Sequence, residues 1–387
     1  MLTHQDPIIA YDSGRCTRCG TCLASCPVDA LRLTEGRDVF DITVDHATCI
    51  GCLKCVGVCP AATLPERPLR ESDFATMRRA LLACASDVTQ RHKATSGGVA
   101  RTLARAALAS KWVDAVYCAV QRNDEPYAEG AFLTSIDEID RVSNSVYCAF
   151  PFNRNLRMKH GGQRLKRVLY IGTNCQIQAA ERFFRDSGVD LIKVGIICKQ
   201  QKTRGYVRWA RRMLKQKADD TTPIRYRGYG WPGRMTSGAA TYQNYFRPFS
   251  MELWRVPGCR FCPHALGDGS DVLLADPWKL ISTTDGNPGL TMTLLRTDRA
   301  LALWNIATPY LTEDRELTAA DVQISIDWKG YQKKQARISY FLGLEASSAR
   351  RLFYGFIENQ RYLYEWLIST FPVPEIIEKL LNRTLKK

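Results

Sequence analysis

The sequence predicts a chain that combines α+β and α/β architecture in three parts: a small cysteine-rich module, a mixed α/β domain and a helical C-terminal extension. Three observations predict this arrangement. A run of four cysteines that ends in proline occurs twice within the first 60 residues. Two strand-length apolar runs, RVLYIG and DLIKVGII, flank a segment with the amphipathic pattern of a helix. Near the C-terminus, aromatic residues recur at helical spacing before a pair of prolines. We therefore expect a module at 1–62, a linker at 63–75, a mixed domain at 76–300 and a helical region at 301–387.

Composition indicates metal chemistry in a reducing compartment. The 387-residue chain has 15 cysteines, and its start, MLTHQDPIIAYDSG, lacks the basic flank and apolar core of an export signal. No stretch approaches about 18 uninterrupted apolar residues, so we expect no membrane span and a cytoplasmic location. Closely spaced cysteines in that compartment indicate metal ligands rather than disulfides.

The two cysteine runs have the spacing typical of two 4Fe-4S clusters. They are Cys16, Cys19, Cys22, Cys26-Pro27 and, 33 residues later, Cys49, Cys52, Cys55, Cys59-Pro60. Three closely spaced thiolates hold one cluster, while the fourth cysteine of each run reaches the other cluster. We therefore expect one cluster on Cys16, Cys19, Cys22 and Cys59, and one on Cys49, Cys52, Cys55 and Cys26. Zinc favours separated pairs and fits this spacing badly, so we interpret the module as a bacterial-type ferredoxin domain.

The large domain is expected to begin with helices. TLPERPLRESD, with its prolines and charges, has the composition of a linker. We expect one helix at residues 74–85 and another after Ser96-Gly97-Gly98. The free N–H groups at such a helix start suit a phosphate or pyrophosphate, although most Ser-Gly-Gly helix starts bind nothing.

Four later cysteines are expected to form a third site. The strand, helix and strand of residues 167–197 predict two parallel neighbouring strands, which end at Cys175 and Cys198. That edge is where α/β sheets bind ligands. Cys259 and Cys262 would complete a four-thiolate site for a third 4Fe-4S cluster or a structural zinc.

With these residues in view, the chain resembles the coenzyme F-420 hydrogenase/dehydrogenase beta-subunit family in its form with an N-terminal two-cluster ferredoxin. The resemblance is carried by Ser96-Gly97-Gly98, Ser145-Val146-Tyr147, GTNCQIQA, GIIC, RGYGWPG, CRFCP and ADPW. It implies a flavin domain that binds FAD beside a cluster held by the four late cysteines. It also implies that the flavin contacts Ser96, Gly97, Gly98, Ser145, Tyr147 and Thr173. Asn174, Ala275, Val146 and Lys199 depart from the usual family pattern, so the fold carries over more safely than the substrate.

The charge is distributed unevenly along the chain. Residues 1–60 contain five Lys/Arg and seven Asp/Glu, a net charge of −2, and since the whole chain is +15, the remaining residues hold +17. KQQKTRGYVRWARRMLKQK is basic with interleaved aromatic residues, a pattern found in nucleic-acid-binding strips. A solvated helix face, an anionic ligand and an acidic electron donor are the alternatives.

These observations predict an iron–sulfur flavoprotein that passes electrons from a ferredoxin-like acidic donor through three 4Fe-4S clusters to FAD. The flavin would then reduce a small organic substrate, for which the basic surface favours an anion. Lys199, Tyr147 and Asp276 are catalytic candidates by position. The main alternative is oxidation of a reduced deazaflavin or nicotinamide, with the electrons passed to a partner; the other is a nucleic-acid-binding iron–sulfur protein. The C-terminal aromatic stripe predicts a homo-oligomer or a packed core.

Overall fold

The computed structural model describes residues 14–36, 38–62, 77–157, 165–217, 220–250, 252–262, 266–267, 269–283, 286–341, 363 and 365. The expected linker and the C-terminal aromatic stripe lie outside these residues.

The N-terminal module has a compact cysteine-bearing core. Its elements are α2 (Thr21–Ser25), β1 (Leu31–Thr34), β2 (Asp41–Val44) and α3 (Lys54–Gly57). β1 and β2 pair antiparallel, with Leu31 opposite Val44, and bury Leu31 and Ile42 beside Cys26 and Cys55.

The large domain is built on one mixed eight-stranded sheet, with strand order β12-β3-β11-β10-β7-β6-β4-β5. The strands are β3 (Arg79–Ala85), β4 (Ala115–Gln121), β5 (Ala128–Leu133), β6 (Arg167–Thr173), β7 (Asp190–Ile196), β10 (Val272–Ala275), β11 (Thr291–Leu295) and β12 (Leu311–Glu316). β10, β7, β6 and β4 are mutually parallel, and the outer pairs are antiparallel. The central parallel strands are apolar on both faces because helices cover both sides.

The expected strand–helix–strand unit is confirmed. β6, α6 (Asn174–Phe184) and β7 form it, and β6 pairs parallel with β7 from Arg167 opposite Asp190 onward. The helix after Ser96-Gly97-Gly98 is also confirmed, as α5 (Val99–Ala109).

Two local expectations were wrong. Residues 79–85 form the strand β3 instead of continuing a helix over 74–85, because a short apolar run buried on both faces has no period that separates strand from helix. The region from 301 onward is not purely helical, since β12 pairs with β3 and extends the sheet. Its other described elements are α9 (Asp298–Ala307), η5 (Thr308–Tyr310), α10 (Ala319–Ile326) and α11 (Trp328–Phe341).

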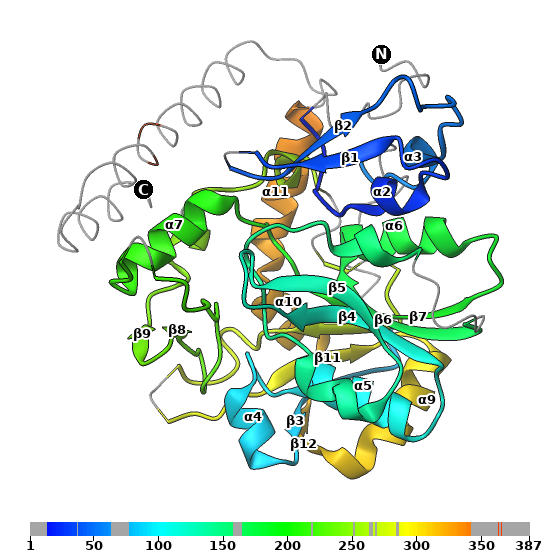
Figure 1. The fold of residues 1–387 in the computed structure, drawn as a ribbon. Coiled ribbons are helices and arrows are strands. Elements are labelled where there is room, and N and C mark those ends of the chain that lie inside the picture. The colour runs from blue at the N-terminus through cyan, green and yellow to red at the C-terminus, as the bar shows by residue number, and fades with distance from the viewer. Residues whose placement is uncertain are drawn as a thin grey trace.

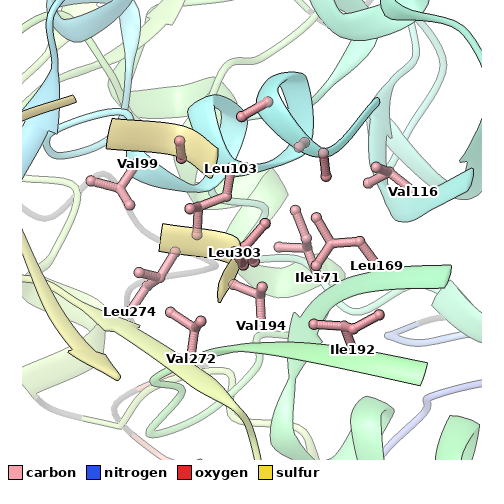
Figure 2. Close-up of a cluster of buried hydrophobic side chains, with 14 of the residues drawn as sticks. Val99, Leu103, Val116, Leu169, Ile171, Ile192, Val194, Val272, Leu274 and Leu303 are labelled. Carbon is pink, nitrogen blue, oxygen red and sulfur yellow. The ribbon is translucent and has the colours of Figure 1, made fainter. Parts of the chain in front are cut away.

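Helices cover both faces of the sheet (Figure 1). On one face, Val99 and Leu103 of α5 and Leu303 of α9 pack against Leu169 and Val194 (Figure 2). On the other face, α6 covers the β4–β6 side, while α10 and α11 cover the β3–β11 side. The alternation follows from the pleat, because successive strand side chains point to opposite faces.

A second, smaller layer follows β7. It contains α7 (Arg204–Met213), β8 (Met235–Ser237), β9 (Ala240–Tyr242), α8 (Arg247–Ser250) and η4 (Pro257–Arg260). Its own core is aromatic and includes Tyr206, Trp209, Tyr226, Tyr245 and Trp254. The remaining short elements are α4 (Val88–Lys93), η2 (Ile136–Arg141) and η3 (Phe152–Asn155). Within the described part of the chain, no helix is long and apolar enough to cross a membrane.

Candidate electron-transfer site

The cysteines of the N-terminal module surround its small core, and two of them show which other thiols lie near. Burial raises the pKa of Cys22 well above its ordinary value, and the neighbouring thiols of Cys19, Cys16, Cys59 and, least, Cys55 add to the rise, so the two expected sets adjoin each other. We call Cys16, Cys19, Cys22 and Cys59 the first site. Burial raises the pKa of Cys55 to about 11, with further contributions from Cys52 and Cys26. We call Cys49, Cys52, Cys55 and Cys26 the second site.

The four late cysteines also lie together, and we call them the third site. Burial, followed by the neighbouring thiols of Cys259 and Cys262, raises the pKa of Cys198 to about 12. After burial, the strongest influences on the pKa of Cys175 are Cys262 and then Cys19 of the first site. In agreement with this, α2, which carries Cys22, packs against α6, which carries Cys175, so the first and third sites are neighbours.

The donor chemistry of all three sites fits iron–sulfur clusters. Clusters take thiolates, and binding of iron would displace the protons from these thiols. A single metal ion is a different case: among the described residues, no group of three or more His, Cys, Asp or Glu side chains could hold one. In a four-iron cluster each iron takes its own thiolate, so the ligand sulfurs stand farther apart than around one ion.

Hydrogen bonds orient the third site. The backbone N–H of Gln201 donates to Cys259 Sγ over 3.4 Å, and the Thr173 hydroxyl lies 3.5 Å from Cys175 Sγ. Thr173 begins α6 in a capping box with Gln176, which fixes where Cys175 lies at the helix start.

Three neighbouring parallel strands bring the third site and a buried ion pair to one sheet edge. β6 leads into Cys175, β7 leads into Cys198, and β10 leads into Asp276. The Asp276 carboxylate accepts hydrogen bonds from Ser96 Oγ at 2.7 Å and from Arg227 Nη1 at 2.6 Å. Candidate residues from distant parts of the sequence therefore meet at the carboxyl ends of the strands, as parallel sheets favour.

Arg227 is the centre of this second cluster, and sequence reasoning did not identify it. Its side chain is 3% exposed and lies among three aromatic rings, with Trp231 at 5.1 Å, Tyr245 at 5.5 Å and Trp278 at 5.8 Å. Burial lowers the pKa of Arg227, but the charge and hydrogen bond of Asp276 together with the neighbouring Tyr245 and Tyr147 outweigh it, so the pKa is raised. The Tyr147 hydroxyl lies 3.5 Å from Arg227 Nη1, and the Tyr147 ring stacks on Tyr245.

A cavity of about 560 Å³ adjoins this cluster. Its lining comprises His92, Tyr229, Gly230, Trp231, Pro232, Gly233, Arg234, Gln243, Asn244, Phe246, Trp278, Thr283, Gly286 and Asn287. Two buried donors beside it, Arg227 Nη2 and Trp231 Nε1, have no hydrogen-bond partner within the described residues. An unmet buried donor costs about 1–3 kcal/mol, so a ligand with acceptor atoms fits this place.

The remaining predicted site residues have varied surroundings. The Gly97 N–H donates to Thr291 Oγ1 at 2.9 Å, and a Cβ at Gly97 would lie 2.6 Å from the Ala83 carbonyl oxygen. Packing against the sheet therefore accounts for Gly97 without a ligand. Gly98 caps α5 with φ +84°. Lys199 pairs with Asp327 at 3.4 Å, and the Ser145 N–H donates to Thr95 Oγ1.

The basic run forms α7, which faces the N-terminal module. Arg204 lies 3.3 Å from Glu35, and Arg208 lies 2.6 Å from Asp38. Tyr206 and Trp209 are buried against each other in the aromatic core and offer no stacking surface. The nucleic-acid interpretation of this run therefore loses its aromatic platform.

Comparisons with known proteins agree with this architecture. Residues 80–157 match the N-terminal domain of the coenzyme F420 hydrogenase/dehydrogenase beta subunit, and residues 165–317 match its C-terminal domain. Residues 15–63 match a 4Fe-4S dicluster domain.

Two relatives extend the comparison. An F(420)H(2) dehydrogenase subunit from Methanosarcina mazei is 27% identical over 195 residues, which are 47% of this chain and 53% of that protein. The chain thus spans about half the length of this curated relative. A chain of the F420-reducing [NiFe] hydrogenase complex from Methanosarcina barkeri superposes with a TM-score of 0.52 at 17% identity, covering 67% of this chain and 90% of that one. This second likeness concerns the fold alone.

The two beta-subunit domains together cover more than half of the sequence, and the dicluster module precedes them in the same chain. The chain therefore belongs to the coenzyme F420 hydrogenase/dehydrogenase beta-subunit family, in a form that carries its own 4Fe-4S dicluster domain.

Proposed function

We propose that the chain is an iron–sulfur oxidoreductase subunit that carries electrons between a flat two-electron ligand in the aromatic cavity and a one-electron partner at the N-terminal module. The observation that supports this best is the shared sheet edge. Cys175, Cys198 and Asp276 follow three consecutive parallel strands of the sheet, and α2, which carries Cys22 of the first site, packs against α6, which carries Cys175.

Three 4Fe-4S clusters would occupy the three cysteine sites, one in each. When bound, such clusters accept and release one electron at a time. The second site is the one best suited to a partner, because Cys52 is exposed and the neighbouring Ile50 is 64% exposed. The named relatives are parts of larger complexes, so we propose a different protein, rather than a second copy of this chain, as the neighbour here.

The cavity suits a flavin or deazaflavin ring. Trp231 and Trp278 line the cavity and offer aromatic surface, and Trp231 Nε1 offers a donor for a ring oxygen or nitrogen atom. Arg227 is not part of the lining but packs against both tryptophans, and its Nη2 is a second donor without a partner among the described residues. We propose FAD as the resident group on the chemistry of this cavity. When bound, a flavin exchanges two electrons with an organic partner and single electrons with clusters. Asp276 and Ser96 hold Arg227 in place for this role.

The two relatives are named for F420, so we propose a reduced deazaflavin as the two-electron partner. The opposite direction, from a ferredoxin-like acidic donor to a small organic substrate, is favoured by one observation: the chain after residue 60 carries a net charge of +17. Tyr147 lies beside Arg227 and is the better placed of the proton-transfer candidates, because Lys199 is engaged with Asp327.

Purification without oxygen, followed by iron counting and extraction of bound ligands, tests this proposal. We expect about twelve irons and one flavin per chain. Turnover with reduced deazaflavin and a dye acceptor is then compared with turnover driven by reduced ferredoxin. Eight irons with one zinc would make the third site structural, and a protein without flavin that oxidises no deazaflavin would refute the proposed function.

A further inference from the structure

Asn153 lies fully buried where η3 meets the N-terminal module, and each of its polar groups is bonded. Its backbone N–H donates to the Cys19 carbonyl at 2.8 Å. Its Nδ2 donates to Thr21 Oγ1 at 2.8 Å and to the Gln176 carbonyl at 2.9 Å. Its Oδ1 accepts from the Tyr170 hydroxyl at 2.6 Å. One amide therefore joins α2 of the module, β6 of the sheet and the first turn of α6.

Two of these three elements, α2 and α6, carry a cysteine of the neighbouring sites. Thr21 Oγ1 lies 3.4 Å from Cys19 Sγ of the first site. Gln176 follows Cys175 of the third site directly in the sequence and caps the same helix start. α2, which carries Cys22 of the first site, packs against α6, which carries Cys175 of the third site. Asn153 is thus bonded to one segment that carries a cysteine of the first site and to one that carries a cysteine of the third site.

The surrounding packing leaves this junction little freedom. A Cβ on Gly20 would lie 2.8 Å from the Pro151 Cβ, and one on Gly258 would lie 2.1 Å from the Cys16 carbonyl oxygen. Ala24 of α2 belongs to the same buried apolar cluster as Phe152 of η3. In Figure 1, α2 accordingly lies directly against α6.

We propose that Asn153 is a positioning residue for electron transfer, which fixes the separation of the first and third sites by bonding to both segments. The inference rests on the proposed function, because it requires a cluster in each site. In the step concerned, one electron leaves the first site and arrives at the third, and no bond forms or breaks. The rate of electron tunnelling falls steeply with distance. The hydrogen bonds of Asn153, which hold the two segments at a fixed separation, therefore control the rate of transfer between the first and third sites.

The test compares three variants of the full chain. Asn153→Leu keeps the branched shape and removes every side-chain hydrogen bond of the clamp. Thr21→Val removes one of these bonds from the module side, with little change in volume. Asn155→Leu is the matched control on the same short helix, because its Nδ2 donates only to Gly130 O, at 2.8 Å, among the bonds found.

Each reduced protein is examined by electron paramagnetic resonance for the magnetic interaction between clusters, and by rapid mixing for the rate at which the third cluster fills. Iron content and the midpoint potential of each cluster are measured in parallel, since Thr21→Val also alters the surroundings of Cys19. We expect full iron content in all variants. Asn153→Leu should show a weakened interaction and a several-fold slower transfer, Thr21→Val a smaller change, and Asn155→Leu the wild-type result.

The outcomes separate this inference from the proposed function. If wild type contains no third cluster, the three-cluster part of the proposed function fails, and this inference fails with it. If wild type holds three clusters but Asn153→Leu and Thr21→Val keep its interaction and rate, the positioning role is refuted. An equal change in Asn155→Leu would refute it too, because the effect would then reflect general loosening of η3. Should Asn153→Leu not fold, Thr21→Val alone decides the matter.

Discussion

The buried pair of Arg227 and Asp276 makes the sharpest prediction about the cavity. Asp276→Asn leaves the side-chain size unchanged and removes the charge. Its amide has one oxygen, whereas the carboxylate uses two to accept from Ser96 at 2.7 Å and Arg227 at 2.6 Å. One of these donors must then face an NH2 group, and the guanidinium loses its counter-charge.

The magnitude follows from burial. Removal of one partner of a buried ion pair costs about 3–5 kcal/mol. The Asp276 side chain is 25% exposed, which lets water compensate in part, and three aromatic rings still face the cation. We therefore expect a loss of about 2 kcal/mol in the free energy of unfolding of the large domain. For a domain of this size that corresponds to a fall in Tm of roughly 5 °C.

Urea denaturation followed by tryptophan fluorescence measures this loss, and Trp231 and Trp278 report on the site itself. Asp124→Asn is the control, because its ion pair with Arg122 is exposed on both sides and should contribute no more than about 1 kcal/mol. The double variant Arg227→Met with Asp276→Asn should be less destabilised than Asp276→Asn alone, since no unpaired charge remains. Equal losses in Asp276→Asn and Asp124→Asn would refute the reasoning.

Three further predictions concern the electron path and a buried cation. Cys262→Ser should lose the third cluster, because a hydroxyl is a poor iron ligand. Reduction of the flavin by electrons that enter at the N-terminal module should then slow or stop. A normal rate of flavin reduction, measured by stopped flow, would show that Cys262 is not on the electron path. Cys52→Ser should block the entry of electrons from a protein donor. The amount of extractable flavin should stay at the wild-type level, because Cys52 lies in a module with its own core. Loss of flavin would show that the module and the flavin-binding domain are not independent. Burial lowers the pKa of Lys202 from 10.5 to about 7. Between pH 7 and pH 10.5 the unfolded chain therefore binds more protons at this side chain than the folded chain does. The free energy of unfolding must then rise with pH, by up to about 1.4 kcal/mol per pH unit. In urea midpoints measured from pH 7 to pH 10, Lys202→Met should flatten this rise, and an unchanged slope would show that other groups cause it.

The parts of the fold that sequence analysis predicted well are those fixed by local pattern. The strand–helix–strand unit shows its periods within thirty residues, and the cysteine spacing contains the crossed grouping of the first and second sites. β3 was mistaken for helix because seven consecutive residues of a strand covered on both faces carry no alternation. β12 has the composition of a polar surface segment, and only its pairing with β3 makes it a strand.

The site residues that sequence analysis missed depend on contacts between distant segments. Arg227 is placed by Asp276 and Ser96, which lie 49 and 131 positions away. The glycine- and tryptophan-rich segment RGYGWPG indicated this region of the site, but it did not indicate that its first residue, Arg227, forms the buried ion pair. Asn153 lies in a short 3₁₀ turn with no repeating pattern, and its partners come from three separate elements.

The charge asymmetry noted in the sequence raises the question of what holds the module on the large domain. The acidic β1–β2 connection does face the basic helix α7, through Arg204 with Glu35 and Arg208 with Asp38. Glu35 is 89% exposed, and both members of the second pair are more than half exposed. Pairs of this kind contribute about 0–1 kcal/mol each and weaken further in salt. The buried bonds of Asn153 and the apolar packing of Ala24 are not screened in this way, and Arg157 and Arg182 add hydrogen bonds to the Cys26 and Cys59 carbonyls of the module. It follows that salt should leave the two sites in place, and that the ionic pairs serve to orient the module rather than to hold it.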